Sequence, residues 1–313
     1  MIADSTRTTP EPASTTDENS AFEVRLRELR PRLHRYCARM TGSIFDGEDV
    51  LQETYVKALQ AFAEQHGEIV RLESWLFRIA NNTALDWLRR RARQESTTLP
   101  DENASEAADT ASGPDTPAEI STGLRRFMQL PVIQRSSVIL MDVLGYELQE
   151  IAAMLEVSVA AVKSALHRGR ARLAELAREA EPAAICVLPP RERVLLERYV
   201  TRFNARDFDA VRDMLADEVK LDLVQRVRYH GKAKVSTYMH NYEGVAGWRF
   251  SIGIVEGRDV IVVRDPNFST DQPAYLICLD WQDDRVTSIR DFRYARYVMD
   301  CIEISASHRH IPN

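Results

Sequence analysis

One short acidic stretch, SIFDGEDVLQETYVKAL at residues 43–59, contains four carboxylates: Asp46, Glu48, Asp49 and Glu53. Apolar residues recur there with helical spacing, which predicts a helix whose buried side is formed by Val50, Leu51, Tyr55 and Leu59. The acids have two interpretations. In the first, Asp46 caps the helix and the other acids interact favourably with the partial positive charge at the helix N-terminus. Alternatively, the acids form a docking patch for a basic partner.

A second stretch, ESWLFRIANNTALDWLRRRAR at residues 73–93, alternates aromatic, amide and arginine side chains. Aromatic rings stack on unpaired bases, amides bond base edges and arginines hold the phosphate backbone, as binding to single-stranded nucleic acid requires. The alternative is that Trp75, Phe77 and Trp87 are core residues for most of their area.

The stretch LQEIAAMLEVSVAAVKSALHRGRARL, residues 148–173, fits a helix-turn-helix template. Ser158 can cap the second helix, and Glu156 stands where the turn favours glycine and requires a left-handed backbone. The polar side of the second helix suits the major groove of DNA. That side carries Lys163, Ser164, His167, Arg168, Arg170 and Arg172. The alternative is an ordinary helical hairpin with a solvated basic face.

These stretches sit in a chain of 313 residues with a formal net charge of -6. That charge excludes a protein that coats nucleic acid nonspecifically, so DNA contact must come from local basic surfaces. The four cysteines show no CxxC pair or zinc-like spacing, which predicts reduced cytosolic thiols. No signal peptide or membrane-length apolar run occurs, so we expect a cytoplasmic protein.

Composition and periodicity predict three domains. The N-terminal residues 1–20 read as a disordered tail, and 21–93 as the first helical domain. An acidic linker without Lys or Arg occupies 94–119, and a second helical domain 120–180. A joint at 181–190 precedes an α+β domain at 191–302 with a tail at 303–313. Its five strand-like segments are VKLDLV, WRFSIGIVE, DVIVVRD, AYLICLDWQ and RVTSIRDFRY.

The two helical blocks resemble regions 2 and 4 of bacterial RNA polymerase sigma factors of the extracytoplasmic-function (ECF) type. DGEDVLQETYVKAL with WLFRIANNTALDWLRRR is similar to region 2, and LPVIQRSSVILMDVLGYELQEIAAMLEVSVAAVKSALHRGRARL to region 4. The resemblance implies a multidomain protein that binds core RNA polymerase and directs recognition and melting of promoter DNA. It implies no catalytic residue, metal or cofactor.

The resemblance also implies residue roles. The acidic helix would dock on the polymerase β′ clamp through Asp46, Glu48, Asp49, Gln52 and Glu53. The melted −10 element would meet Trp75, Arg78, Asn81, Asn82, Arg89, Arg90 and Arg91. The −35 element would meet Ser158, Lys163, Ser164, His167, Arg168 and Arg170, with the polymerase β flap as a further partner. Ala160, Ala161 and Ala165 depart from the family pattern and remove side chains that could reach DNA.

Residues 191 to about 300 resemble the SnoaL-like, cone-shaped α+β domains appended to some of these sigma factors. The resemblance implies regulation in cis and makes a small ligand in the cone a candidate partner. Related folds place an Asp or His in the cone as a general base. The candidates here are Asp222, His230, Asp280, Asp291 and Tyr238, although ordinary strand and surface roles are favoured. The alternative function is therefore a small-molecule cyclase or isomerase with a DNA-binding attachment.

Overall fold

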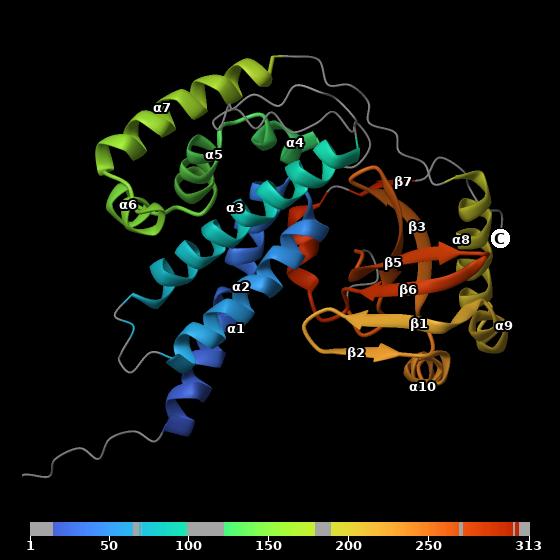
Figure 1. Cartoon of the computed structure of the whole chain (residues 1–313). Helices are drawn as coiled ribbons and strands as arrows, with labels where there is room; N and C mark the ends of the chain where they lie inside the picture. Colours follow the sequence, from blue (N-terminus) through green and yellow to red (C-terminus); the bar gives the residue numbers. More distant parts are fainter. Residues whose placement is uncertain are drawn as a thin grey trace, which may run out of the picture.

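The computed structural model describes residues 15–64, 69, 71–98, 122–178, 189–268, 272–302 and 304–306. Most of the predicted linker at 94–119, most of the joint at 181–190 and most of both predicted tails lie outside these residues. Within the described part, no helix is long and apolar enough to cross a membrane. The chain forms two helical domains and a C-terminal α+β domain (Figure 1), so the expected fold class is confirmed.

The first helical domain consists of α1 (Thr15–Thr41), α2 (Ile44–Glu64) and α3 (Leu72–Thr98). Helix α1 begins inside the predicted tail, and α3 continues past the predicted boundary at residue 93. Pro31 lies inside α1, although proline usually interrupts a helix. Leu33 and Tyr36, which follow it, are fully buried, so packing compensates for the backbone hydrogen bond that proline cannot donate.

The second helical domain contains α4 (Thr122–Met128), α5 (Val132–Val138) and a π-helical turn, η1 (Ile139–Val143). The predicted helix-turn-helix follows as α6 (Leu148–Leu155) and α7 (Val159–Leu176). A hydrophobic core continues from the first helical domain into the second; it includes Leu76, Phe77, Ile139, Tyr146 and Ile151. The edge of the Phe77 ring meets Tyr146 with ring centroids 5.1 Å apart. The two helical domains are therefore packed against each other.

The C-terminal domain begins with α8 (Pro190–Asn204) and α9 (Phe208–Asp213), followed by β1 (Leu215–Leu223), β2 (Val227–His230) and α10 (Lys232–Glu243). It continues with β3 (Arg249–Val255), β4 (Arg258–Arg264), β5 (Tyr275–Gln282), β6 (Arg285–Asp291), η2 (Arg296–Cys301) and β7 (Ser305–Ala306). All five predicted strands are present; β2 and β7 are additional. The sheet order is β2-β1-β6-β5-β4-β3-β7, with β1 and β6 parallel and the other pairs antiparallel.

The two faces of this sheet pack against different parts of the molecule. Alternation along β4 sends Ile261 and Val263 into a core shared with α8–α10, and Val260 and Val262 to the opposite face. That opposite face meets α1 and α2, where Ala38, Ile44 and Phe45 belong to the same buried cluster. The short helix η2 lies between the sheet and the helices (Figure 1). The C-terminal domain is thus joined to the first helical domain by an apolar core.

Gly47 lies where α1 and α2 approach each other closely. A Cβ atom added there would lie 2.5 Å from the Ala38 Cα atom, so the helices would have to separate. We expect Gly47→Ala to lower the free energy of unfolding by about 2 kcal/mol, measured by urea titration. Gly244→Ala is the matched control because its added Cβ would meet nothing within 4 Å. Equal effects of the two substitutions would contradict this close packing.

Candidate protein and nucleic-acid interfaces

The cap of the acidic helix α2 is Ser43, and the prediction for Asp46 was wrong. The Ser43 hydroxyl accepts the backbone N–H groups of Phe45 and Asp46 at 3.2 and 3.3 Å. The helix begins one residue after Ser43, which leaves Asp46 in its first turn, where it pairs with Arg91 at 3.0 Å. Val50 and Leu51 are buried as expected, but Leu59 is 44% exposed.

Glu48 is a buried structural residue. Its side chain has no exposed surface, and it accepts hydrogen bonds from Arg30 at 2.5 Å and from the Tyr297 hydroxyl at 2.7 Å. Tyr297 also accepts from the Arg30 guanidinium at 2.8 Å. The three side chains come from α2, α1 and η2. In this conformation Glu48 is unavailable to a docking partner, contrary to the role predicted for it.

The remaining predicted docking residues lie at the surface, and two of them contact the C-terminal domain. Asp49 accepts from the Arg290 guanidinium at 2.6 Å, and the Gln52 side-chain oxygen accepts from Arg228 at 2.9 Å. Glu53 pairs within its own domain with Arg90 at 2.7 Å. The hydrogen bond from Arg90 lowers the pKa of Glu53. The Asp49 side chain remains 53% exposed, so a partner can still reach it.

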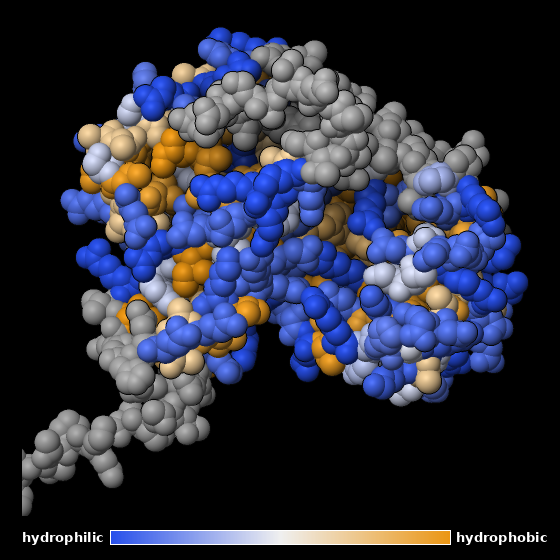
Figure 2. Space-filling view, viewed as in Figure 1, coloured by the Kyte–Doolittle hydropathy of each residue, from blue (hydrophilic) through white to orange (hydrophobic). Residues whose placement is uncertain are grey.

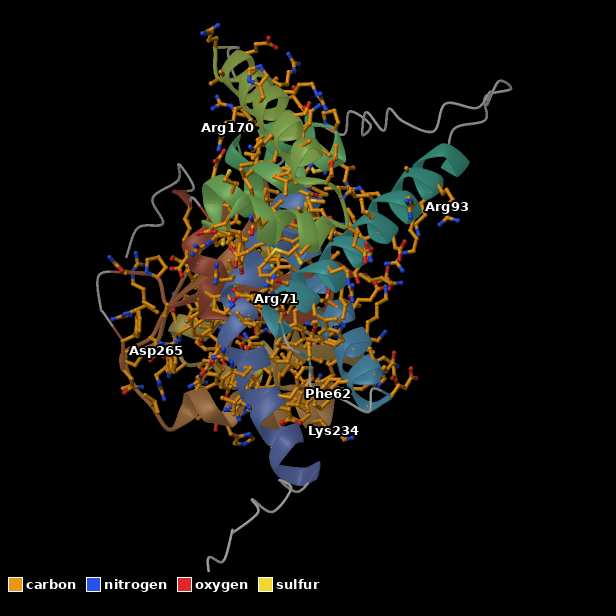
Figure 3. All side chains as sticks on the ribbon, turned by 90° about the vertical axis from the view of Figure 1, so that its left-hand side faces the viewer. Phe62, Arg71, Arg93, Arg170, Lys234 and Asp265 are labelled. Atoms are coloured by element: carbon orange, nitrogen blue, oxygen red, sulfur yellow. The ribbon has the colours of Figure 1, made fainter. Side chains whose placement is uncertain are left out.

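The aromatic residues of α3 agree largely with the core interpretation. Phe77 is buried, while Trp75 and Trp87 are half-buried. Trp75 meets Phe22 edge-on with centroids 6.3 Å apart, and Arg91 lies 5.2 Å over the Trp87 ring. The C-terminal part of α3, where Arg93 is labelled, projects away from the rest of the molecule (Figure 3).

The two adjacent asparagines of α3 differ in exposure. Asn82 is exposed, whereas Asn81 is buried and accepts from Tyr36 at 2.8 Å and from Ser136 of α5 at 3.2 Å. Asn81 therefore links the helical domains and cannot contact DNA in this conformation, contrary to the prediction. All four predicted arginines of α3 are ion-paired: Arg78 with Glu156 at 3.1 Å, Arg89 with Asp86 at 3.4 Å, Arg90 with Glu53 and Arg91 with Asp46.

The helix-turn-helix has the predicted local geometry. Glu156 adopts the left-handed conformation at φ 56, and the Ser158 hydroxyl accepts the Ala161 N–H at 3.1 Å. The predicted DNA-facing residues Lys163, Ser164, His167, Arg168 and Arg170 are exposed. Ala165 was expected at a position that could reach DNA, but it is buried and does not lie on the DNA-facing side. Ala160 and Ala161 are exposed.

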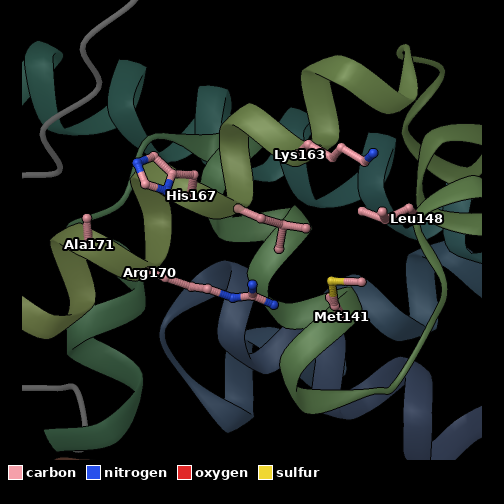
Figure 4. A pocket seen from close by; sticks show the side chains of 7 residues that line it. Met141, Leu148, Lys163, His167, Arg170 and Ala171 are labelled. Atoms are coloured by element: carbon pink, nitrogen blue, oxygen red, sulfur yellow. The ribbon is translucent and has the colours of Figure 1, made fainter.

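A pocket of about 580 Å³ lies beside these basic residues. Its lining includes Met141, Leu148 and Leu166, and Lys163, His167 and Arg170 surround it (Figure 4). Hydrophobic residues also gather at the surface over α5–α7 (Figure 2). Arg170 forms an ion pair of 2.5 Å with Asp142 of η1, which holds its guanidinium at the pocket. DNA contact by Arg170 therefore requires exchange of this partner.

The candidate cavity residues of the C-terminal domain do not form one site. Asp222 lies 3.3 Å from Arg228, His230 is exposed 3.6 Å from Glu218, and Asp280 pairs with Arg258 at 2.5 Å. Only Asp291 and Tyr238 come together.

Asp291 is 1% exposed and accepts the hydroxyls of Tyr238 at 3.0 Å and Tyr242 at 3.3 Å. It also accepts the Arg293 backbone N–H at 2.8 Å. Burial raises the pKa of Asp291 to about 6, and these hydrogen bonds offset part of that effect. Its oxygens accept three hydrogen bonds within a cluster of buried apolar side chains, so the arrangement favours a structural role over general-base catalysis.

Sequence reasoning missed the residues that contact α2 from the C-terminal domain, above all Arg228, Arg290 and Tyr297. The only sequence signal is the run RDFRYARY at 290–297, which alternates basic and aromatic residues near the end of the last long strand. Nothing in that run indicates that its partner is an acidic helix some 240 residues earlier in the chain, as the Arg290–Asp49 separation of 241 shows.

Comparisons with known proteins match both helical blocks. The model of Sigma-70 region 2 matches residues 26–94, and that of Sigma-70 region 4 matches residues 124–173. The ECF RNA polymerase sigma factor SigG of Mycobacterium tuberculosis (strain ATCC 25618 / H37Rv) is 30% identical over 310 residues, covering 90% of this chain and 83% of the relative. Since 90% of the chain is matched, the similarity extends into the C-terminal domain.

Two solved structures are also similar. The crystal structure of the M. tuberculosis ECF sigma factor SigJ is 18% identical and covers 87% of this chain and 95% of that chain, with a TM-score of 0.34. The Bartonella quintana sigma factor RpoE, solved in complex with the anti-sigma factor NepR, is 24% identical and covers 52% of this chain and 99% of that chain, with a TM-score of 0.40.

The raised pKa of Asp291 predicts a pH-dependent stability. The folded chain binds this proton more tightly than the unfolded chain, so the contribution is present at pH 4 and lost as pH rises through about 6. The groups facing Asp291 are Tyr199, Tyr238, Tyr242, Tyr275 and Arg293. Relative to wild type, we expect Asp291→Asn to gain about 2 kcal/mol of unfolding free energy between pH 4 and pH 7, because the unfolded carboxyl is already partly ionised at pH 4. Urea titrations measure this, with the exposed Asp284→Asn as control; parallel pH curves would contradict it.

Proposed function

The chain belongs to the ECF family of bacterial RNA polymerase sigma factors. We propose that the structure represents a resting state that its own C-terminal domain controls. In this proposal α2 docks on core polymerase, while α3 and α7 contact the −10 and −35 promoter elements. The C-terminal domain regulates these steps in cis. The chain acts by binding and catalyses no reaction.

The observation that carries this proposal is the contact between Arg290 and Asp49. A docking acid of α2 is held at 2.6 Å by an arginine of the C-terminal domain, and Gln52 is held in the same way by Arg228. A basic polymerase surface would have to compete with these arginines. Because both contacts are partly solvated, each is worth roughly 1 kcal/mol or less, a strength that lets a partner displace it.

The packing of the two helical domains supports the same resting state. Helices α3 and α6 are in contact, and Arg78 of α3 pairs with Glu156 at the end of α6. The −10 and −35 elements are about 25 base pairs apart, which is about 85 Å of B-form DNA. Helix α7 packs on α6, so it lies too close to α3 for the two DNA-contacting helices to reach both elements at once. Promoter binding therefore requires the second helical domain to separate from the first.

The alternative function, catalysis in the C-terminal cone, depends on Asp291 and its tyrosines. A general base needs a lone pair directed at a substrate, but the oxygens of Asp291 already accept three hydrogen bonds and the side chain is almost fully buried. This arrangement supports regulation by an appended domain over turnover of a small molecule.

Run-off transcription with purified core polymerase tests the proposed function. We expect the full-length chain to produce promoter-specific transcripts. Charge reversal by Asp49→Lys with Glu53→Lys should weaken core binding by about tenfold or more, because like charges would then face the basic docking surface. Circular dichroism checks that the fold is retained. Absence of promoter-specific transcripts, or co-purification with polymerase that the charge reversal leaves unchanged, would refute the docking role.

Removing the internal competitors tests regulation in cis. We expect Arg228→Gln with Arg290→Gln to strengthen binding to core polymerase by about three- to tenfold, because Asp49 and Gln52 become free. The matched control is Arg191→Gln, which removes an exposed arginine paired with Asp284 away from α2. Equilibrium titration with fluorescently labelled chains measures the affinity. Equal or weaker binding of the double variant would rule out competition by these arginines.

A further inference from the structure

The interface between α1–α2 and the C-terminal domain has an apolar centre. The sheet face opposite α8–α10 contributes Val260, Val262, Leu276 and Cys278, and the segment after β6 contributes Phe292 and Val298. The Phe292 ring meets Phe45 of α2 edge-on with centroids 5.8 Å apart. If the domains separated, both surfaces would become exposed to water, which is costly for so many buried apolar side chains.

Buried polar contacts join the same two parts. Glu256, in the turn between β3 and β4, is 4% exposed and accepts the Ile44 N–H at 2.7 Å, at the start of α2. The C-terminal domain thereby supplies part of the N-terminal cap of the docking helix. Tyr297 completes the hydrogen bonding of buried Glu48. Detachment would break both contacts, so the C-terminal domain is poorly suited to act as a removable lid.

The rim of this interface contains a second acceptor for the arginines. In the sheet, Asp222 of β1 is the register partner of Arg228 on β2 and of Arg290 on β6. Its carboxylate oxygens lie 3.3 Å from Arg228 Nε and 4.0 Å from Arg290 Nε. Asp222 therefore stands between the two arginines that hold α2, within their own domain.

We propose that the C-terminal domain stays attached to α1 and α2 during polymerase docking, and that Asp222 takes over Arg290 and Arg228 as they release Asp49 and Gln52. Polymerase then meets a composite surface, with the acids of α2 beside Arg228 and Arg290, whose positive charge Asp222 offsets in part. Because Arg290 is largely buried, its charge needs an anion after Asp49 has gained a polymerase partner. This inference rests on the proposed docking role of α2.

The test is Asp222→Asn in the full-length chain, with binding to core polymerase as the readout. Without the second acceptor, the arginines depend more strongly on Asp49 and Gln52, so the affinity should fall by about two- to fivefold. Asp284→Asn, an exposed aspartate paired with Arg191, is the matched control. A merely structural role is excluded by a double-mutant cycle. In the Arg228→Gln, Arg290→Gln background, Asp222→Asn should have no effect on affinity.

A distance measurement tests whether the domain stays attached. Labels are placed at exposed Gln60 of α2 and Lys234 of α10 through non-natural amino acids, which leaves the native cysteines intact. We expect the same label distance in the free chain and in its purified complex with core polymerase. A longer distance in the complex overturns the inference. So does an Asp222→Asn variant with wild-type affinity when removal of the arginines raises affinity. If neither set of substitutions changes affinity, the proposed regulation by the arginines is refuted, and this inference is refuted with it.

Discussion

The buried carboxylate of Glu48 is the constraint on which the arrangement of this molecule depends. An anion with no exposed surface requires donors around it, and here they are Arg30 of α1 and Tyr297 of η2. Satisfying Glu48 brings one residue from each of three elements to the same point. It thereby fixes the angle of α2 on α1 and holds the segment after β6 against both. The ion pair of Arg290 with Asp49 is one consequence of that position.

Buried and exposed residues of α2 have different roles. The inner residues Glu48 and Ile44 attach the helix to the C-terminal domain through contacts that water cannot replace. The outer residues Asp49 and Gln52 make partly solvated contacts with arginines, which another protein can replace at low cost. The same helix can therefore belong permanently to one interface and reversibly to another. The proposed regulation in cis then needs only the exchange of surface partners.

Local patterns in the sequence predicted local structure well. Alternation predicted the five long strands, and the helix-turn-helix template predicted the left-handed Glu156 and the cap at Ser158. The failures concern faces and partners. Asn81 and Ala165 stand among polar or exposed neighbours, yet contacts from other helices bury them. The Arg228–Gln52 contact spans 176 residues, so no window of sequence contains both partners. Exposure of a site residue is decided by tertiary packing, which periodicity alone does not specify.

The interface between the two helical domains and the interface with the C-terminal domain differ in the new contacts that opening would allow. Both bury apolar side chains, and re-exposing five of them costs on the order of 10 kcal/mol. In the proposed promoter-bound state the second helical domain separates and its basic helix α7 gains promoter DNA, so binding there can offset the cost. The sheet face that packs on α1 and α2 would gain no comparable partner, because its apolar residues already pack against Ile44 and Phe45. Opening between the helical domains, with the C-terminal domain retained, is therefore the less costly route to a promoter-binding state.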